Sequence, residues 1–424
     1  MLTTGYPHGR DPVAGAFVRA MARALAARGH GLRVLCAALP GQRPLEDPGV
    51  TVIPVRYHPA RTFYGAGAPH HLRGSPAAVA GGAVFTLGLA RAAARAAGVS
   101  PVPGTDGPVE SLEMAREALQ HIGLPALVKA VGGGGGIGMQ IVRDEAALER
   151  AIKSCSDRAA QAFNDPRVYI ERYIEGPRHL EVQIFGDTHG TVVALGEREC
   201  SLQRRHQKIL EESPAPALAG EGGHGHRAQI LEAAARVGRA AGYVGAGTCE
   251  FIWDEKRQEF YFLEVNCRIQ VEHAVTEMVT GTDLVEHQLR VAAGEPLDPA
   301  LCHVTPQGHA IEVRVYAEDP ARGFIPKPGD VTEAVWPVGD GVRVDAGVAA
   351  PGRVTSYYDP MIAKIIAHGP DRTTAIARLD AALAATRVAP LVTNLGFLRA
   401  VLVSPEFTAG RYDTAFAEVF AKRK

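Results

Sequence analysis

The sequence predicts an α/β protein built from several domains, and three observations lead to this fold class. Apolar stretches of strand length alternate along the chain with stretches that carry helix start and stop signals. The chain has 424 residues, enough for about two to four domains that each bury a core. Hydrophobic residues make up 46% of it, as in an ordinary globular protein. The expected elements fall into three blocks, which we assign to residues 1–97, 98–305 and 306–424.

The first block is predicted to be a partial Rossmann-like segment. Asp11 and Pro12 supply an N-cap and a first-turn proline for a helix, and Gly29 follows its expected end at residue 28. The stretch 61–76 is rich in Gly, Pro and His, which indicates an irregular loop before an Ala-rich helix over 77–97. Strands are expected at 2–4, 32–39 and 50–56.

The second and third blocks continue the alternation of strands and helices. In the second block, helices are expected at 111–121, from 144 onward, and at 228–241. Its strands are expected at 126–131, 139–142, 168–174, 179–185, 192–197, 247–253 and 259–265. In the third block, strands are expected at 310–316, 331–336, 342–348 and 361–368, and helices at 373–386 and 394–402.

Composition and charge exclude several classes of protein. The formal net charge of −1 gives no overall attraction to nucleic acid or to an anionic membrane. The apolar stretch 77–89 is shorter than the roughly 20 residues of a membrane helix, and no signal peptide is expected at the start. The six cysteines are scattered without CxxC spacing, which indicates reduced thiols in a cytoplasmic protein.

A glycine-rich loop lies between the strands expected at 126–131 and 139–142. Six of the seven residues from 132 to 138 are glycine, so backbone N–H groups there can approach phosphate oxygens closely. Lys129, on the preceding strand, adds a positive charge. The pattern favours phosphate binding, and a flexible hairpin connection is the alternative.

Two neighbouring strands carry oxygen ligands for a metal ion. Glu250 lies on the strand 247–253, and Glu264 and Asn266 lie on or next to the strand 259–265. Carboxylate and amide oxygens suit Mg²⁺ or Mn²⁺ held against ATP phosphates. Because both carboxylates sit within apolar strands, where an unpaired charge is costly, a metal site is favoured over two edge carboxylates facing solvent.

Arg268, Gln270 and Glu272 alternate along the residues that follow, so an extended segment would point all three the same way. A guanidinium beside an amide can hold a small planar anion, and a nearby carboxylate could remove its proton. A solvated polar face is the alternative.

Residues 203–208 contain four potential cations in six positions. A nucleic-acid patch or an exposed loop would have this composition. On a chain of nearly neutral charge, a small ligand rich in phosphate explains the cluster better.

Six ordered blocks of this sequence resemble the biotin carboxylase family over residues 98–416. They are KAVGGGGGIGM, YIERYIEGPRHLEVQIFGD, GERECSLQRRHQK, FLEVNCRIQVEHAVTEMVTG, HAIEVRVYAEDP and YYDPMIAKIIAHG. The resemblance implies an ATP-grasp domain over 98–305 and a biotin carboxylase C-terminal domain over 306–424. It implies a ligase that forms carboxyphosphate from ATP and bicarbonate and passes its CO₂ to N1 of biotin on a carrier domain.

The resemblance also implies roles for individual residues. Those that would hold ATP phosphates and the closing lid are Lys129, Gly135, Gly136 and His179; those at the adenine hinge are Glu171, Arg172 and Ile174; those near the ribose are Gln203 and His206. Two Mg²⁺ or Mn²⁺ ions would be bound by Glu250, Glu264 and Asn266. Bicarbonate would be held by Lys208, Arg268, Gln270 and Val271, with Glu272 as the base that deprotonates it. Arg268 would also stabilise the biotin enolate, and Arg353 would contact biotin or carboxyphosphate.

The finer similarity is to the urea carboxylase branch, the carboxylase half of urea amidolyase, although His206 fits the acyl-CoA carboxylases better. Two signatures are altered. The usual Asn-Thr-Arg has Cys267 in its centre, and the usual HPVTE has Ala274 in place of proline. Both changes conserve size and are expected to spare function.

The front of the chain departs further from the family. The family's Met-Gly-Asp-Lys segment, whose lysine touches ATP, would fall at residues 84–87, where no lysine occurs. Residues 3–72 instead resemble the opening of a GT-B glycosyltransferase, without the donor-binding half of such enzymes.

These observations support an active biotin carboxylase component of a urea or acyl-CoA carboxylase. The alternatives are a catalytically impaired hybrid fragment that binds ATP, and a glycosyltransferase fragment. No Ala-Met-Lys-Met site for biotin appears in the sequence, so a biotinyl carrier domain and a carboxyltransferase are expected on another chain. The family implies a homodimer, and no nucleic-acid or membrane partner is expected.

Overall fold

The computed structural model describes residues 2–3, 32–37, 48, 50–55, 94–131, 138–205, 207–220 and 223–423. The chain separates into two compact units, residues 1–84 with 160–165, and residues 85–159 with 166–424. In the first unit, β1 (Leu2–Thr3), β2 (Leu32–Ala37) and β3 (Val50–Val55) form a parallel sheet in the order β1-β2-β3. The three strands expected in the first block are therefore confirmed, with slightly different ends. The helix expected at 11–28 and the loop expected at 61–76 lie outside the described residues.

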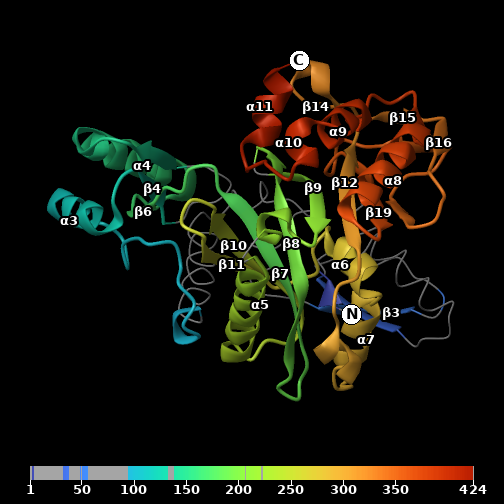
Figure 1. Cartoon of the computed structure of the whole chain (residues 1–424), viewed down its shortest axis with the longest axis horizontal. Coiled ribbons are helices and arrows are strands. Elements are labelled where there is room, and N and C mark those ends of the chain that lie inside the picture. Colours follow the sequence, from blue (N-terminus) through green and yellow to red (C-terminus); the bar gives the residue numbers. More distant parts are fainter. Residues whose placement is uncertain are drawn as a thin grey trace. The chain divides into compact units, whose positions relative to one another are not determined.

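A small antiparallel sheet with two helices forms one end of the second unit (Figure 1). Its order is β5-β4-β6, with β4 at Ala126–Ala130, β5 at Met139–Val142 and β6 at Val168–Arg172. The helices are α3 (Leu112–Ile122), whose N-cap Ser111 accepts a hydrogen bond from Met114 N, and α4 (Leu148–Phe163). Apolar side chains of α3 and α4 pack on this sheet around a buried core. The expected elements of this region are confirmed.

An eight-stranded antiparallel sheet organises the rest of the unit. Its order is β11-β10-β7-β8-β9-β12-β19-β17. The strands are β7 (Arg178–Gly186), β8 (Val192–Arg204), β9 (Gln207–Ser213), β10 (Gly245–Asp254), β11 (Glu259–Asn266), β12 (His309–Tyr316), β17 (Val342–Ala346) and β19 (Met361–Gly369). The β9–β12 pairing makes the sheet continuous from the second predicted block into the third.

Helices cover both faces of this sheet. On β7 and β8 lies α5 (Gly223–Ala240). On β12 and β19, α6 (His273–Thr280) covers the face of Ala310 and Ile366, and α8 (Arg372–Ala385) covers the opposite face. The remaining helices are α7 (Leu284–Ala292), α9 (Leu395–Leu402), α10 (Pro405–Thr408) and α11 (Phe416–Lys422).

Short strand pairs complete the C-terminal part. They are β13 (Glu318–Asp319) with β14 (Ile325–Pro326), β15 (Gly329–Val331) with β18 (Gly352–Val354), and β16 (Glu333–Val335) with β20 (Arg387–Ala389). The single strand expected at 331–336 is thus wrong, because the chain breaks there into β15 and β16. The prediction ended β8 seven residues before its end at Arg204. It also missed β9, β13, β14, β18, β20, α6, α7, α10 and α11.

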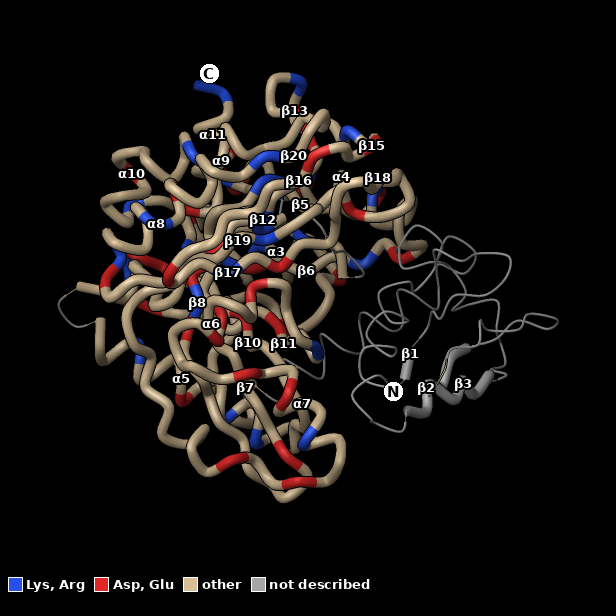
Figure 2. Tube along the Cα trace, turned by 90° about the vertical axis from the view of Figure 1, so that its right-hand side faces the viewer, with Lys and Arg blue, Asp and Glu red and all other residues tan. Residues whose placement is uncertain are grey.

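Charged residues of both signs occur along the whole of the coloured trace (Figure 2). Within the described residues, no helix is both long enough and apolar enough to cross a membrane.

A buried carboxylate fastens the C-terminal helices to the large sheet. Glu212, on β9, is fully buried. It accepts hydrogen bonds from Arg372 Nη2 and Nε at 2.9 and 2.7 Å, lies 2.6 Å from His309 Nε2, and accepts from the Tyr412 hydroxyl. Burial alone would raise the pKa of this carboxyl group, but the charge of Arg372 outweighs it and lowers the pKa to about 2. Its stabilising contribution is therefore complete above about pH 5 and is lost as the pH falls toward 2.

We predict that Arg372→Met lowers the free energy of unfolding at pH 7 by about 3 kcal/mol or more, because Glu212 is left buried without its main cation. Urea unfolding of the full chain measures this. Arg399→Met is the matched control, since Arg399 forms only an exposed ion pair with Asp380, and little change is expected. Equal losses in the two variants would contradict the role of Glu212.

Candidate active site

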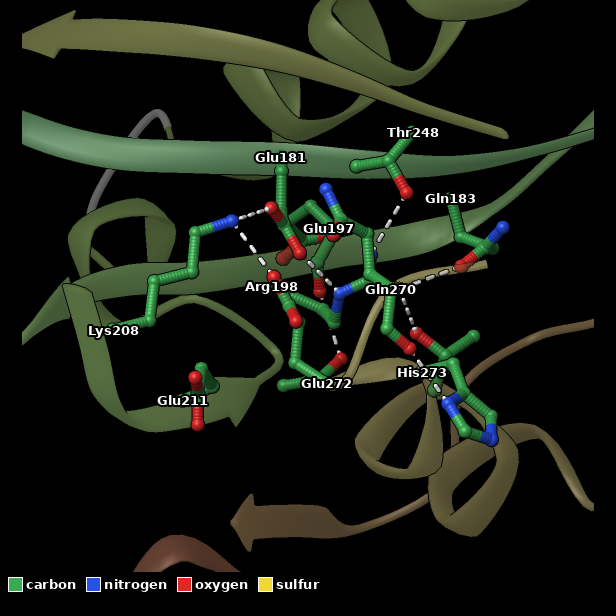
Figure 3. A network of polar contacts seen from close by, with 12 residues as sticks. Glu181, Gln183, Glu197, Arg198, Lys208, Glu211, Thr248, Gln270, Glu272 and His273 are labelled. Carbon is green, nitrogen blue, oxygen red and sulfur yellow. Dashed lines mark hydrogen bonds and ion pairs between the residues drawn. The ribbon is translucent and has the colours of Figure 1, made fainter. Parts of the chain in front are cut away.

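An ammonium group on the large sheet is surrounded by three carboxylates, and Figure 3 shows two of them, Glu181 and Glu272, beside Lys208. Lys208 Nζ, on β9, lies 2.5 Å from Glu181, 3.1 Å from Glu250 and 2.7 Å from Glu272. All three carboxylates are buried. Burial alone would lower the pKa of Lys208, but the carboxylates outweigh it and the pKa is raised well above its usual value. The site therefore holds a permanent cation.

A second cation, Arg198 on β8, lies beside Glu181. Its guanidinium is fully buried and donates to Glu181 at 2.6 Å. It also donates to Gln183, Thr276 and Thr248, at 2.8, 3.0 and 3.1 Å. Burial would raise the pKa of Glu181, but Lys208 and Arg198 lower it to about 2. Glu181 is thus an anion locked between two cations.

The predicted metal ligands come together on β10 and β11. Glu250 and Glu264 are directly opposite one another in the strand register. Asn266 Nδ2 lies 3.0 Å from Glu250 Oε1 and 3.4 Å from Glu264 Oε1. Burial and the charge of Glu250 raise the pKa of Glu264, so a divalent cation between the two would relieve their repulsion. The set of hard oxygen ligands fits Mg²⁺ or Mn²⁺.

His179, on β7, extends this group. Its Nε2 lies 3.1 Å from Glu250 Oε2, and its Nδ1 lies 2.8 Å from Gln203 Nε2. Ligand atoms of His179, Glu181 and Glu250 all lie within 4.8 Å of one another. Two predicted ATP residues, His179 and Gln203, therefore adjoin the metal ligands.

The predicted anion site lies on the irregular segment between β11 and α6. Arg268 Nη1 donates to Gln270 Oε1 at 2.5 Å, and Gln270 Nε2 lies 3.4 Å from Glu250. Gln270 and Glu272 are buried, whereas Arg268 is exposed. The alternative prediction of a solvated polar face is therefore wrong for Gln270 and Glu272. Lys364 Nζ holds the backbone carbonyl of Val271 at 2.5 Å.

The predicted base is held by cations on both carboxylate oxygens. Glu272 Oε1 lies 2.7 Å from Lys208, and its Oε2 lies 2.9 Å from Arg314 Nη2. Arg314, on β12, is half-buried and also lies 2.6 Å from Glu211. By contrast, Arg353 on β18 is exposed and pairs with Asp330 at 3.4 Å, so the structure does not bring it to this cluster.

The predicted adenine residues lie on and beside β6. Lys129 Nζ pairs with Glu171 Oε1 at 2.6 Å across β4 and β6, and this charge outweighs burial to raise the pKa of Lys129. Arg172 Nη1 donates to the Tyr261 hydroxyl at 3.2 Å. Ile174 is buried against Val102 and Tyr261. Gly135, Gly136 and His206 lie outside the described residues.

Sequence reasoning missed three charged residues of the site: Glu181, Arg198 and Arg314. Each lies within a largely buried strand, in HLEVQIF, GERECSL and AIEVRVY. A charge inside a strand that is buried on both faces must have a partner, and that signal was available. The partner itself is not visible in the sequence, because each ion pair joins different strands.

The structure also revises the interpretation of residues 203–208. Gln203 and Arg204 end β8, and Lys208 lies in β9, so the segment straddles a hairpin. Arg204 is buried and pairs with Glu318 at 2.7 Å, and Arg205 N donates to Glu418. Among the cations of this segment that the structure describes, only Lys208 lies at the carboxylate cluster.

We predict that Glu264→Gln weakens binding of Mn²⁺ with ADP at least about tenfold, because one of the two facing carboxylate charges is removed. Titration of the full chain followed by the electron paramagnetic resonance signal of free Mn²⁺ measures this. Glu259→Gln, at the other end of β11, is the matched control and should bind as the unaltered chain does. Unchanged affinity in Glu264→Gln would remove Glu264 from the metal site.

Two family models match the chain in order. The model described as "Carbamoyl-phosphate synthase L chain, ATP binding domain" matches residues 88–300, and the model described as "Biotin carboxylase C-terminal domain" matches residues 312–419. Biotin carboxylase 1 of Bacillus subtilis is 45% identical over 345 residues, which cover 81% of this chain and 76% of that protein.

Relatives with longer chains match as well. The methylcrotonoyl-CoA carboxylase subunit alpha of Mus musculus is 47% identical over 76% of this chain and 44% of its own length. The urea amidolyase of Lachancea kluyveri is 44% identical over 80% of this chain and 18% of its own length. These alignments give no support to the glycosyltransferase likeness of residues 3–72.

Solved structures of the same kind share the fold. The biotin carboxylase of Campylobacter jejuni in complex with β,γ-ATP has a TM-score of 0.76 and 32% identity, covering 95% of this chain and 96% of that chain. The biotin carboxylase domain dimer of Hydrogenobacter thermophilus 2-oxoglutarate carboxylase, with MgADP, ADP and bicarbonate, has a TM-score of 0.71 and 39% identity, covering 79% and 74%. With both family models matched and 81% of its length aligned at 45% identity, the chain belongs to the biotin carboxylase family of ATP-grasp ligases.

Proposed function

We propose that this chain carboxylates biotin on a carrier domain, using ATP and bicarbonate and passing through carboxyphosphate. One observation carries the proposal. The buried base Glu272 is held between the cations Lys208 and Arg314, and Lys208 also contacts Glu250 of the metal ligand set. A proton acceptor, an anion site and a metal–phosphate site therefore meet within one cluster.

Bicarbonate must lose its proton as its oxygen attacks the terminal phosphorus of ATP, whose bond to the bridging oxygen breaks so that ADP leaves. Glu272 is the acceptor that the geometry supplies, since its carboxylate is fixed in place by two cations. The exposed guanidinium of Arg268 and the amide of Gln270 would bind the bicarbonate oxygens from the open side. Bound Mg²⁺ or Mn²⁺ would neutralise the charge on the phosphates beside Glu250 and Glu264.

Carboxyphosphate then breaks its C–O bond to give CO₂ and phosphate. The released phosphate takes the proton of biotin N1, and N1 attacks the CO₂ to form the new N–C bond. The negative charge that develops on the biotin ureido oxygen requires a cation at the open side of the site. Arg268 is the exposed cation beside the buried base, and we assign it this task.

The nucleotide is proposed to bind between the small sheet and the large one. Lys129 on β4 pairs with Glu171, next to a cavity of about 280 Å³ lined by Tyr169, Glu171 and the segment 100–105. For Lys129 to reach a phosphate, this ion pair must open when ATP arrives. Gly135, Gly136 and His206 are proposed ATP residues on the strength of the sequence alone.

The relatives of this chain indicate which partners to propose for it. Biotin carboxylase relatives include a subunit of methylcrotonoyl-CoA carboxylase and a part of urea amidolyase. We propose a biotinyl carrier domain and a carboxyltransferase on another chain, serving urea or an acyl-CoA, together with a homodimer and a cytoplasmic location.

A second candidate function is a catalytically impaired hybrid that binds ATP without efficient turnover. The observation that favours it is the absence of a lysine at residues 84–87, where the family's ATP-contacting lysine is expected. These residues lie outside the described part of the chain. ATP affinity close to that of an active relative, with no turnover, would support this candidate over the first.

We predict that the purified full chain releases phosphate from ATP when Mg²⁺, bicarbonate and free biotin are present, and that this release depends on bicarbonate. Glu272→Gln and Arg268→Ala should each lower this rate about 100-fold or more, because a base or an anion-binding cation is lost. A coupled phosphate assay measures the rate, and circular dichroism checks the fold.

Glu286→Gln, on the exposed face of α7, is the control and should keep the full rate. No phosphate release above background by the unaltered chain would reject the proposed activity. Full activity of either site variant would reject the role given to that residue.

A further inference from the structure

Two buried glutamates lie side by side behind the proposed base. Glu211 on β9 and Glu312 on β12 are directly opposite in the strand register, so their side chains share one face of the sheet with Cβ atoms about 5 Å apart. Both are fully buried. Among the described residues, none donates a hydrogen bond of good geometry to any of their four carboxylate oxygens. We refer to Glu211 and Glu312 as the acid pair.

Two cations connect the acid pair to the anion site. Arg314 Nη2 lies 2.6 Å from Glu211 Oε1 and 2.9 Å from Glu272 Oε2. Lys364 Nζ lies 3.5 Å from Glu312 Oε2 and donates to the carbonyl of Val271 at 2.5 Å. Arg314 and Lys364 are themselves directly opposite in the β12–β19 register. Arg314 therefore contacts both the acid pair and Glu272, and Lys364 contacts both the acid pair and the backbone carbonyl of Val271.

The two cations beside the acid pair do not fully neutralise it, because each of them also pairs with another carboxylate. Arg314 is shared with Glu272, and Lys364 is shared with Asp345 at 3.4 Å. The titratable and charged groups that face the pair, directly or through these cations, come from β8, β9, β12, β17, β19 and the start of α6. They are Arg198, Cys200, Lys208, Arg314, Tyr316, Asp345, Lys364, Glu272, His273 and Glu277.

Two like charges in contact away from water cannot both be sustained. Burial raises the pKa of both Glu211 and Glu312 above the ordinary range. The charge of Glu272 adds to this for both, and that of Glu211 adds to it for Glu312. Arg314 and Lys208 oppose the shift at Glu211, and Lys364 and Arg314 oppose it at Glu312. The poor hydrogen-bond geometry toward Arg314 and the 3.5 Å separation from Lys364 agree with a pair that is not fully charged.

We infer that the acid pair positions the anion site, an inference that rests on the proposed function. At neutral pH the pair shares one proton and carries a single negative charge. That charge is enough to orient Arg314 without drawing it away from Glu272. Through Lys364, it also fixes the carbonyl of Val271. Glu211 and Glu312 touch neither substrate nor metal, so they are positioning residues rather than catalytic ones.

Loss of the shared proton at alkaline pH would place a second negative charge on the pair. Arg314 and Lys364 would then be drawn toward it, and their contacts with Glu272 and Val271 would weaken. Bicarbonate binding should therefore decline at alkaline pH, as a loss in kcat/KM for bicarbonate. A residue that only stabilises the fold would not produce this dependence.

The shared proton is tested directly by infrared spectroscopy of the full chain at pH 7, which separates the carbonyl stretch of a protonated carboxyl group from that of a carboxylate. Glu312→Gln and Glu211→Gln should each lose the intensity of one protonated carboxyl group, because the remaining acid faces both cations alone and ionises. Glu212→Gln is the matched control, since Glu212 follows Glu211 in β9 and is bound to Arg372 instead. Undiminished intensity in both pair variants would overturn the inference.

The positioning role is tested by the pH profile of bicarbonate-dependent ATP cleavage. Glu312→Gln mimics the protonated acid permanently, so the alkaline midpoint of kcat/KM for bicarbonate should move up by about one pH unit or more. Glu212→Gln should keep the midpoint of the unaltered chain, and an unmoved midpoint in Glu312→Gln would overturn the positioning role. If the unaltered chain cleaves no ATP, the proposed function fails, and the infrared result still decides whether the acid pair holds a proton.

Discussion

The mutual neutralisation of buried charges is the constraint on which the rest of this site depends. Lys208 and three carboxylates lie in the interior of an eight-stranded sheet, where an unpaired charge of either sign costs several kcal/mol. Arg198 meets this constraint fully, since its guanidinium donates hydrogen bonds to four side chains from two strands and one helix. The cluster is unsuited to stabilising a core by apolar contact. It is suited to holding charged groups in fixed positions before a substrate arrives, which is how electrostatic catalysis works.

The large antiparallel sheet makes this neutralisation possible. Its strand order is not the chain order, so β7, β8 and β9 lie between β10 and β12. This arrangement brings Lys208 of β9 to Glu250 of β10, across two intervening strands, and Arg314 of β12 to Glu272. The sheet runs without interruption into β19 and β17, so Lys364 reaches Val271 from the C-terminal part of the chain. The C-terminal region is therefore part of the chemical site as well as a structural neighbour of it.

Much of the fold was predictable from local signals, and the miss at the centre of the large sheet has a physical cause. Strands with clear apolar runs between turn residues, such as β4, β7, β10 and β19, were placed within one or two residues of their observed ends. The last part of β8 and the whole of β9 were missed because they are dense in charged residues, in the sequence SLQRRHQKILEES. Polar runs of this kind normally indicate loops, since a strand buried on both faces is usually apolar. Here the charges are paired across strands, and no local rule reports a partner that lies far along the chain.

The sequence by itself determined which chemical groups are present and how they follow one another: hard oxygen ligands on Glu250, Glu264 and Asn266, an arginine, an amide and a carboxylate on the next segment, and a family likeness over most of the chain. Only the tertiary structure decided which of them meet. It placed Glu250 opposite Glu264, put Lys208 among three carboxylates, and brought Arg314 rather than Arg353 to the proposed base. The physical reason is that residue types follow from the sequence, whereas neutralising a buried charge depends on contact between strands that lie tens of residues or more apart in the chain.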